Sequence, residues 1–254
     1  MSDRLKFFRK LMSAFEGTSN PQRAVERGFY VNLPNNPIEE ITRRIELRPS
    51  SVHLLFGGIG SGKTTQLLST QQALNELEDI KAIYVDVSLI TDISDLKSGA
   101  LIAIAGLELI KILGNIEEIE IQNSRKIIQD LAYGFNDVKH IFPKKKETNN
   151  VIEKVVTHHA GILSDDKQRV RRKATRAFQV LSRAVKQKFD KEIIFLFDGL
   201  DRISNSQIFI DFAINDVIAI NNVGIGVVIV GSIYTAYKER ENIEQHLGYS
   251  YFMS

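Results

Sequence analysis

The feature that most constrains this fold is a glycine cluster between an apolar run and a helical pattern, in the segment "SVHLLFGGIGSGKTTQLLSTQQALNEL". Glycine loses more conformational freedom on folding than any other residue, so a cluster is unfavourable unless the backbone bends sharply or lies against a ligand. The apolar residues 52–56 predict a buried strand before the cluster, and leucines at helical spacing predict a helix after it. The sequence therefore predicts a strand, a glycine loop and a helix in that order.

The loop carries the complete pattern G-x-x-x-x-G-K-[ST]. This is the P-loop pattern, in which backbone amides cradle phosphates while the lysine and the hydroxyl reach phosphate and Mg²⁺. A helix that starts near Ser61 would point its free N–H groups and the positive end of its dipole at the loop, which favours an anion. A glycine turn without a ligand is the alternative. We expect the nucleotide to contact Gly57, Gly58, Ile59, Gly60, Ser61, Gly62, Lys63, Thr64 and Thr65.

A second motif, "KEIIFLFDGLDR", follows much later in the chain. Residues 193–197 are an uninterrupted apolar run, which is typical of a strand buried on both faces of a parallel sheet, and the run ends in Asp198. This is the Walker B pattern. Mg²⁺ prefers hard oxygen ligands, so we predict that Asp198 holds the metal, directly or through water, together with Thr64. Asp201 is a second acid, close enough to orient the attacking water.

Two other apolar runs predict strands of the same sheet. Residues 80–87 are rich in β-branched and aromatic side chains, and Asp86 near their end is either a site residue or a capping residue. Residues 223–231 predict a strand that ends at Ser232 and lies beside the strand before the glycine loop. Ser232 is then either in contact with the γ-phosphate or attacking water, together with Lys63 and Asp201, or an ordinary hydroxyl at a strand end.

We expect residues 1–50 to form an N-terminal helical segment and residues 51–254 to form one domain with a helical insertion at about 94–190. Residues 1–15 predict a basic amphipathic helix that docks on the domain or a partner, or else lies on a membrane surface. Within the insertion, "GALIAIAGLELIKILG" predicts a buried helix and is shorter than the roughly 20 residues of a membrane span.

A helix starting at Ser164 carries the basic cluster of the insertion. The cluster either binds nucleic-acid phosphate or is a solvated face. The paired histidines 158 and 159 have no acid at metal-ligand spacing, and a lysine run at 144–146 predicts a solvated loop. The cluster comprises Arg169, Arg171, Arg172, Lys173 and Arg176.

Composition excludes several classes of protein. The 254 residues are 43% hydrophobic and 25% charged, which fits one large α/β domain. The chain has no cysteine, which excludes disulfides and thiolate metal sites. The net charge of +2 is too small to indicate nucleic-acid binding by itself. No secretory signal is recognisable at the N-terminus, so we expect a cytoplasmic location.

With both motifs, residues 51–237 resemble the ASCE division of P-loop NTPases, specifically the AAA+ and STAND-like ATPases that include the origin-recognition, NACHT and KAP groups. The run Asp198-Gly199-Leu200-Asp201 resembles the STAND form of Walker B, and its Leu-Asp-Arg ending resembles that of KAP enzymes. The resemblance implies a three-layer α/β fold with a parallel sheet of order 5-1-4-3-2, ATP and Mg²⁺ as ligands, and Ser232 in the sensor 1 place.

The chain departs from this pattern in three respects. Gly199 stands where many AAA+ enzymes carry their catalytic glutamate, which leaves Asp201 for that role. The separation between the two motifs is long and implies the helical insertion; KAP proteins place membrane spans there, and this sequence has none. Fourteen residues follow Arg240, fewer than a helical lid needs, which leaves open that the chain is part of a longer protein.

The sequence thus favours a Mg²⁺-dependent ATPase module whose nucleotide state switches a protein partner or a homo-oligomeric assembly. Two alternatives remain. One is an ATP-gated scaffold with little hydrolysis, which Gly199 and the missing lid favour. The other is a small-molecule kinase, which needs an acceptor pocket and an arginine-bearing lid. GTP is disfavoured because the sequence contains no Asn-Lys-x-Asp signature.

Overall fold

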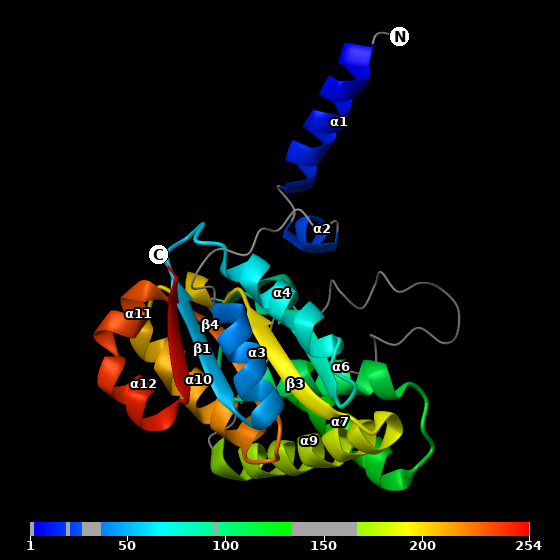
Figure 1. The fold of residues 1–254 in the computed structure, drawn as a ribbon. Helices are drawn as coiled ribbons and strands as arrows, with labels where there is room; N and C mark the ends of the chain where they lie inside the picture. The colour runs from blue at the N-terminus through cyan, green and yellow to red at the C-terminus, as the bar shows by residue number, and fades with distance from the viewer. Residues whose placement is uncertain (1–2, 19–20, 27–36, 94–95, 134–166, 254) are drawn as a thin grey trace.

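The computed structural model describes residues 3–18, 21–26, 37–93, 96–133 and 167–253 (Figure 1). Three sequence interpretations lie outside these residues: the histidine pair 158 and 159, the loop at 144–146 and the helix start at Ser164.

Five parallel strands form a single sheet in the spatial order β2-β3-β4-β1-β5 (Figure 1). Read from the other edge, this is the order 5-1-4-3-2 that the resemblance implies. The central strands are buried along almost their whole length, which explains why their sequences are continuous apolar runs. The strands are β1 (Val52–Gly57), β2 (Ile80–Asp86), β3 (Glu192–Asp198), β4 (Gly226–Ser232) and β5 (Tyr249–Met253).

Helices cover both faces of the sheet. Helix α4 (Lys63–Asn75) connects β1 to β2 and packs on β2 and on α3 (Pro37–Leu47). Helices α9 (Lys167–Phe189) and α10 (Ser206–Asn221) precede and follow β3. The connection from β1 to β2 crosses the sheet in one direction, and the connections from β2 to β3 and from β3 to β4 cross it in the other. Right-handed crossovers therefore place α4 and α10 on opposite faces. The predicted α/β class, with helices on both faces of a parallel sheet, is confirmed.

The predicted insertion contributes a helical layer beside the sheet. In its described part, α6, α7 and α9 pack against one another, and the first half of α6 is completely buried, as expected for its apolar sequence. Within the described residues, no helix combines the length and the apolar character needed to cross a membrane. The other helices are α1 (Asp3–Thr18), α2 (Pro21–Glu26), α5 (Val87–Ile90), α6 (Ala100–Leu113), α7 (Ile119–Tyr133), η3 (Leu200–Arg202), α11 (Ile233–Lys238) and α12 (Arg240–His246).

The N-terminal helices differ in how they meet the domain. Ile41 and Ile45 of α3 are 1% and 0% exposed and belong to the central hydrophobic core, so the packed unit begins before residue 51. Helix α1 forms as predicted, but its large apolar side chains are not covered by the domain. Phe7 and Met12 are 61% and 57% exposed, and Figure 1 shows α1 projecting away from the sheet.

Two element boundaries and one strand differ from expectation. Helix α4 begins at Lys63 and not near Ser61, because Gly62 takes a left-handed conformation immediately before it. Strand β4 begins at Gly226, after a turn in which Gly224 has a φ of 80°. The sequence patterns did not assign residues to strand β5. This strand pairs with β1 in parallel along its whole length.

Candidate functional site

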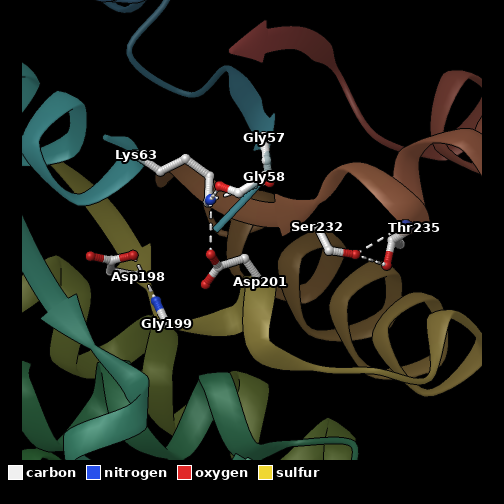
Figure 2. A network of polar contacts seen from close by, with 8 residues as sticks. All are labelled: Gly57, Gly58, Lys63, Asp198, Gly199, Asp201, Ser232 and Thr235. Carbon is white, nitrogen blue, oxygen red and sulfur yellow. Dashed lines mark hydrogen bonds and ion pairs between the residues drawn. The ribbon is translucent and has the colours of Figure 1, made fainter. Parts of the chain in front are cut away.

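The carboxyl ends of β1, β3 and β4 bring the predicted site residues to one edge of the sheet (Figure 2). Gly57 ends β1, Asp198 ends β3, and Ser232 ends β4 opposite Gly57 in the strand register. Open α/β sheets bind ligands at this edge, outside the carboxyl ends of the strands. The glycine loop, residues 57–62, therefore lies where a ligand is expected.

The glycine loop combines a left-handed turn with an open outer side. Gly62 has a φ of 87°, a left-handed conformation that is unstrained for glycine, and α4 starts at the next residue. A Cβ added at Gly58 or Gly60 would meet no atom within 4 Å, so the outer side of the loop is open. The Ser61 hydroxyl is buried without a hydrogen-bond partner in the described part of the chain.

Lys63 is the central cation of the site. Its Nζ donates to the carbonyl oxygens of Gly57 at 3.2 Å and Gly58 at 2.6 Å, and it forms an ion pair with Asp201 Oδ2 at 2.9 Å (Figure 2). The Lys63 side chain is 4% exposed and that of Asp201 is 16% exposed. These three acceptors use all three N–H bonds of the ammonium group. A phosphate that reaches Lys63 must therefore replace at least one of them.

Asp198 is a buried carboxylate whose two oxygens are oriented by different donors. Oδ1 accepts a hydrogen bond from the backbone N–H of Gly199 at 2.7 Å, and Oδ2 accepts one from the Tyr84 hydroxyl at 2.8 Å. Burial, and secondarily the charge of Asp198, raise the pKa of Tyr84 well above its usual value. The phenol therefore stays protonated and remains a donor to Asp198.

Two side chains at this edge, Asp198 and Thr64, could hold a magnesium ion through oxygen. An ionised carboxylate has about four acceptor positions, so Asp198 retains free ones beyond its two hydrogen bonds. Thr64 follows Lys63 in the first turn of α4 and supplies a second hard oxygen. Among the described residues, no group of three or more His, Asp and Glu side chains could hold a metal. A Mg²⁺ ion bound by Asp198 and Thr64 would take its other ligands from phosphate and water.

Asp86 has the capping role that was one of its two predicted interpretations. It lies opposite Asp198 in the register of β2 and β3, and its Oδ1 accepts hydrogen bonds from the backbone N–H of Ser88 at 3.0 Å and from the Ser88 hydroxyl at 2.5 Å. Gly199 has a φ of 81°, and a Cβ there would lie 2.8 Å from Asp86 Oδ1 and 2.9 Å from Ser88 Cβ. A glutamate at position 199 therefore does not fit between these two strand ends.

Ser232 lies at the predicted place, but its hydroxyl is engaged in capping α11. Its Oγ accepts from the backbone N–H of Thr235 at 3.1 Å and lies 2.9 Å from Thr235 Oγ1. Figure 2 shows the hydroxyl turned toward Thr235 and away from Lys63 and Asp201. In this conformation Ser232 acts as a helix cap.

A cleft of about 610 Å³ lies beside this edge, and sequence reasoning did not find it. It is lined by the segment after β2 and by residues that follow Asp201, among them Ser88, Asp92, Arg202 and Asn205. Arg202 donates to the Ser88 hydroxyl at 3.4 Å. The cleft thus contains charged and polar groups next to the proposed water-orienting acid.

The structure therefore brings Lys63, Asp198 and Asp201 together at the glycine loop, whereas three arginines of the basic cluster of α9 line a different concavity against α10. Tyr84 was missed, although it lies two residues before Asp86 on the same face of β2, where alternation places both side chains. The sequence matches no model of a known protein family, and a search of curated proteins finds no significant match.

Proposed function

We propose that this chain is a Mg²⁺-dependent ATPase of the ASCE division, similar to AAA+ and STAND-like ATPases, whose nucleotide state switches a partner protein or an assembly. The observation that carries the proposal is the cluster of Lys63, Asp201 and Asp198 beneath an open glycine loop at the carboxyl edge of a parallel sheet. A nearly buried lysine that faces open glycine backbone is well suited to binding phosphate.

In the proposed cycle, ATP binding exchanges the partners of Lys63. The ammonium leaves Asp201 for phosphate oxygens, which also frees the Asp201 carboxylate. Asp198 and Thr64 would hold Mg²⁺, which neutralises charge on the β- and γ-phosphates when bound. Asp201 then orients a water molecule. The oxygen of this water attacks the γ-phosphorus, and the Asp201 carboxylate accepts the proton that the water loses. The bond from the γ-phosphorus to the bridging oxygen breaks, and ADP and phosphate leave.

A small-molecule kinase is the second candidate, and the cleft beside the edge favours it. A kinase requires an acceptor pocket, and Arg202 could bind an anionic acceptor in this cleft. The two functions differ in where the γ-phosphoryl group goes. An ATPase releases inorganic phosphate in proportion to ADP, whereas a kinase forms ADP without that release when its acceptor is present.

The test is ATP binding by calorimetry in the presence of Mg²⁺. Lys63→Ala removes the cation that faces the phosphates, so we expect at least tenfold weaker binding, about 1.4 kcal/mol. Lys173→Ala is the control, because it removes the same charge from an exposed position on α9 and should leave the affinity unchanged. Equal affinity of Lys63→Ala and the parent would refute the assignment.

Phosphate release separates the ATPase from the scaffold. A parent protein that binds ATP through Lys63 but forms neither ADP nor phosphate, with or without DNA or RNA, would support the ATP-gated scaffold. GTP is a useful comparison nucleotide, because the sequence predicts that ATP is preferred.

A further inference from the structure

A groove lies between α9 and α10, with a volume of about 410 Å³. Helix α9 contributes a stripe of side chains at the spacing i, i+3, i+4 and i+7, and α10 with its following residue contributes a facing stripe. The polar lining residues are Arg171, Arg172, Thr175, Arg176, Gln179, Asn215 and Asn222. We refer to this site as the α9–α10 groove.

The structure divides the basic cluster of α9 into two sets. Arg171, Arg172 and Arg176 line the groove, whereas Arg169 and Lys173 do not. The groove therefore concentrates three guanidinium groups in one concavity, which the sequence alone could not show.

Arg171 is fixed at the inner wall of the groove by α10. Its Nη1 donates to Asn215 Oδ1 at 3.2 Å, and its Nη2 lies 3.7 Å from the carboxylate of Asp216. Asp216 is completely buried and also accepts hydrogen bonds from the backbone N–H groups of Gly99 at 2.7 Å and Leu101 at 3.0 Å. This carboxylate therefore anchors Arg171 and the start of α6.

Arg172 and Arg176 are exposed and lie four residues apart on the helix, about 6 Å along the axis. Within the described ranges, neither forms an ion pair with a carboxylate. Like charges at i and i+4 destabilise a helix by about 0.2 to 0.5 kcal/mol, so this pair is unfavourable unless an anion binds between the groups. Guanidinium groups bind phosphate through two parallel N–H bonds.

The chemistry of the groove indicates a chain of phosphates rather than a single anion. Arginines at one-turn spacing share the groove with the side-chain amides of Gln179 on the same helix and of Asn215 and Asn222 opposite, which can donate to further phosphate and sugar oxygens. Among the residues that the structure describes, no aromatic side chain lines the groove, so these residues offer no platform on which bases could stack. We propose that the α9–α10 groove binds the phosphodiester backbone of a nucleic acid. This site is separate from the glycine loop and does not depend on ATP hydrolysis.

The test is fluorescence anisotropy with labelled 24-nucleotide probes: duplex DNA, single-stranded DNA and single-stranded RNA, at 50 to 200 mM NaCl. Arg172→Ala/Arg176→Ala removes two groove charges. Arg169→Ala/Lys173→Ala is the matched control, because it removes two exposed charges at the same i, i+4 spacing on the same helix but outside the groove.

We expect the parent to bind at least one probe and the groove variant to bind it at least tenfold more weakly at 50 mM salt, with the control changed less than threefold. Loss of two phosphate contacts should make the slope of log affinity against log salt shallower by about 1.8 for a duplex or about 1.4 for a single strand. An unchanged affinity for ATP in the groove variant shows that its fold and loop are intact.

Absence of binding to every probe would overturn the proposal. Equal losses of affinity in the two double variants would also overturn it, because binding would then depend on the total positive charge of α9 and not on the groove. A polyglutamate peptide of matched charge is a further competitor. If it displaces the probe as effectively as unlabelled nucleic acid, the groove binds acidic protein instead.

Discussion

At the scale of single residues, the two acids Asp198 and Asp201 have different partners, because only Asp201 forms an ion pair with Lys63. Asp198 is held by Tyr84 and Gly199, whereas Asp201 neutralises the cation that ATP needs. We predict that Asp201→Asn binds Mg²⁺-ATP about threefold more tightly than the parent, roughly 0.7 kcal/mol, because Lys63 loses its competing partner. The same variant should hydrolyse ATP at least about 100-fold more slowly, since the group that orients water is gone.

Calorimetry and single-turnover hydrolysis measure these two effects separately. Asp198→Asn is the contrasting variant, because loss of a metal ligand should weaken Mg²⁺-dependent binding and hydrolysis together. Hydrolysis by Asp201→Asn at the parent rate would exclude Asp201 from water activation. Weaker ATP binding in that variant would show that the ion pair supports the loop rather than competing with nucleotide.

At the scale of elements, the contact between β1 and β5 depends on a buried histidine. His53 is 0% exposed, its Nε2 lies 2.7 Å from Ser51 Oγ, and its Nδ1 lies 3.1 Å from the Tyr251 hydroxyl. Burial, and then the charge of Arg44, lower the pKa of His53 to about 3. In the unfolded chain the pKa of this histidine is about 6.5. The stability that neutral His53 contributes is therefore fully present above pH 6.5 and is lost as the pH falls toward 3.

We predict that lowering the pH from 6.5 to 5 costs the parent up to about 2 kcal/mol through His53, and that His53→Gln lacks this contribution. The measurement is thermal unfolding of both proteins at pH 7 and pH 5. Burial raises the pKa of Asp216 to about 7, so this group stabilises the folded protein as the pH falls, opposite to His53. Both proteins contain Asp216, so its contribution cancels in the comparison. Equal pH dependence in the two would contradict the assignment.

The elements also show what sequence can and cannot predict. The glycine loop, the strand before Asp198 and the buried helix α6 were predictable because their signals are local. Strand β5 has only five residues, and its pairing with β1 is a long-range contact. The hydrogen bond from Tyr84 to Asp198 spans 114 positions, and the ion pair of Lys63 with Asp201 likewise joins separate motifs, so neither could be read from spacing.

At the scale of the whole molecule, a nucleotide at the loop would connect β1 and α4 with the end of β3. A ligand that binds only the folded state at 100 times its dissociation constant stabilises it by about 2.7 kcal/mol. For a chain of this size we expect a rise of about 5 to 10 °C in the midpoint of thermal unfolding with Mg²⁺-ATP. Lys63→Ala should show about half of that rise, or less, at the same concentration. An equal rise in both would place nucleotide binding elsewhere.

The last described residue of β5 packs against the glycine loop. Met253 pairs with Gly57 in the strand register, and its Cε would lie 3.9 Å from a Cβ at Gly62. Because the sequence contains no cysteine, Met253→Cys would give a single reactive thiol at this place. An environment-sensitive fluorophore attached there would report arrival and departure of nucleotide in real time, without labelling any other part of the chain.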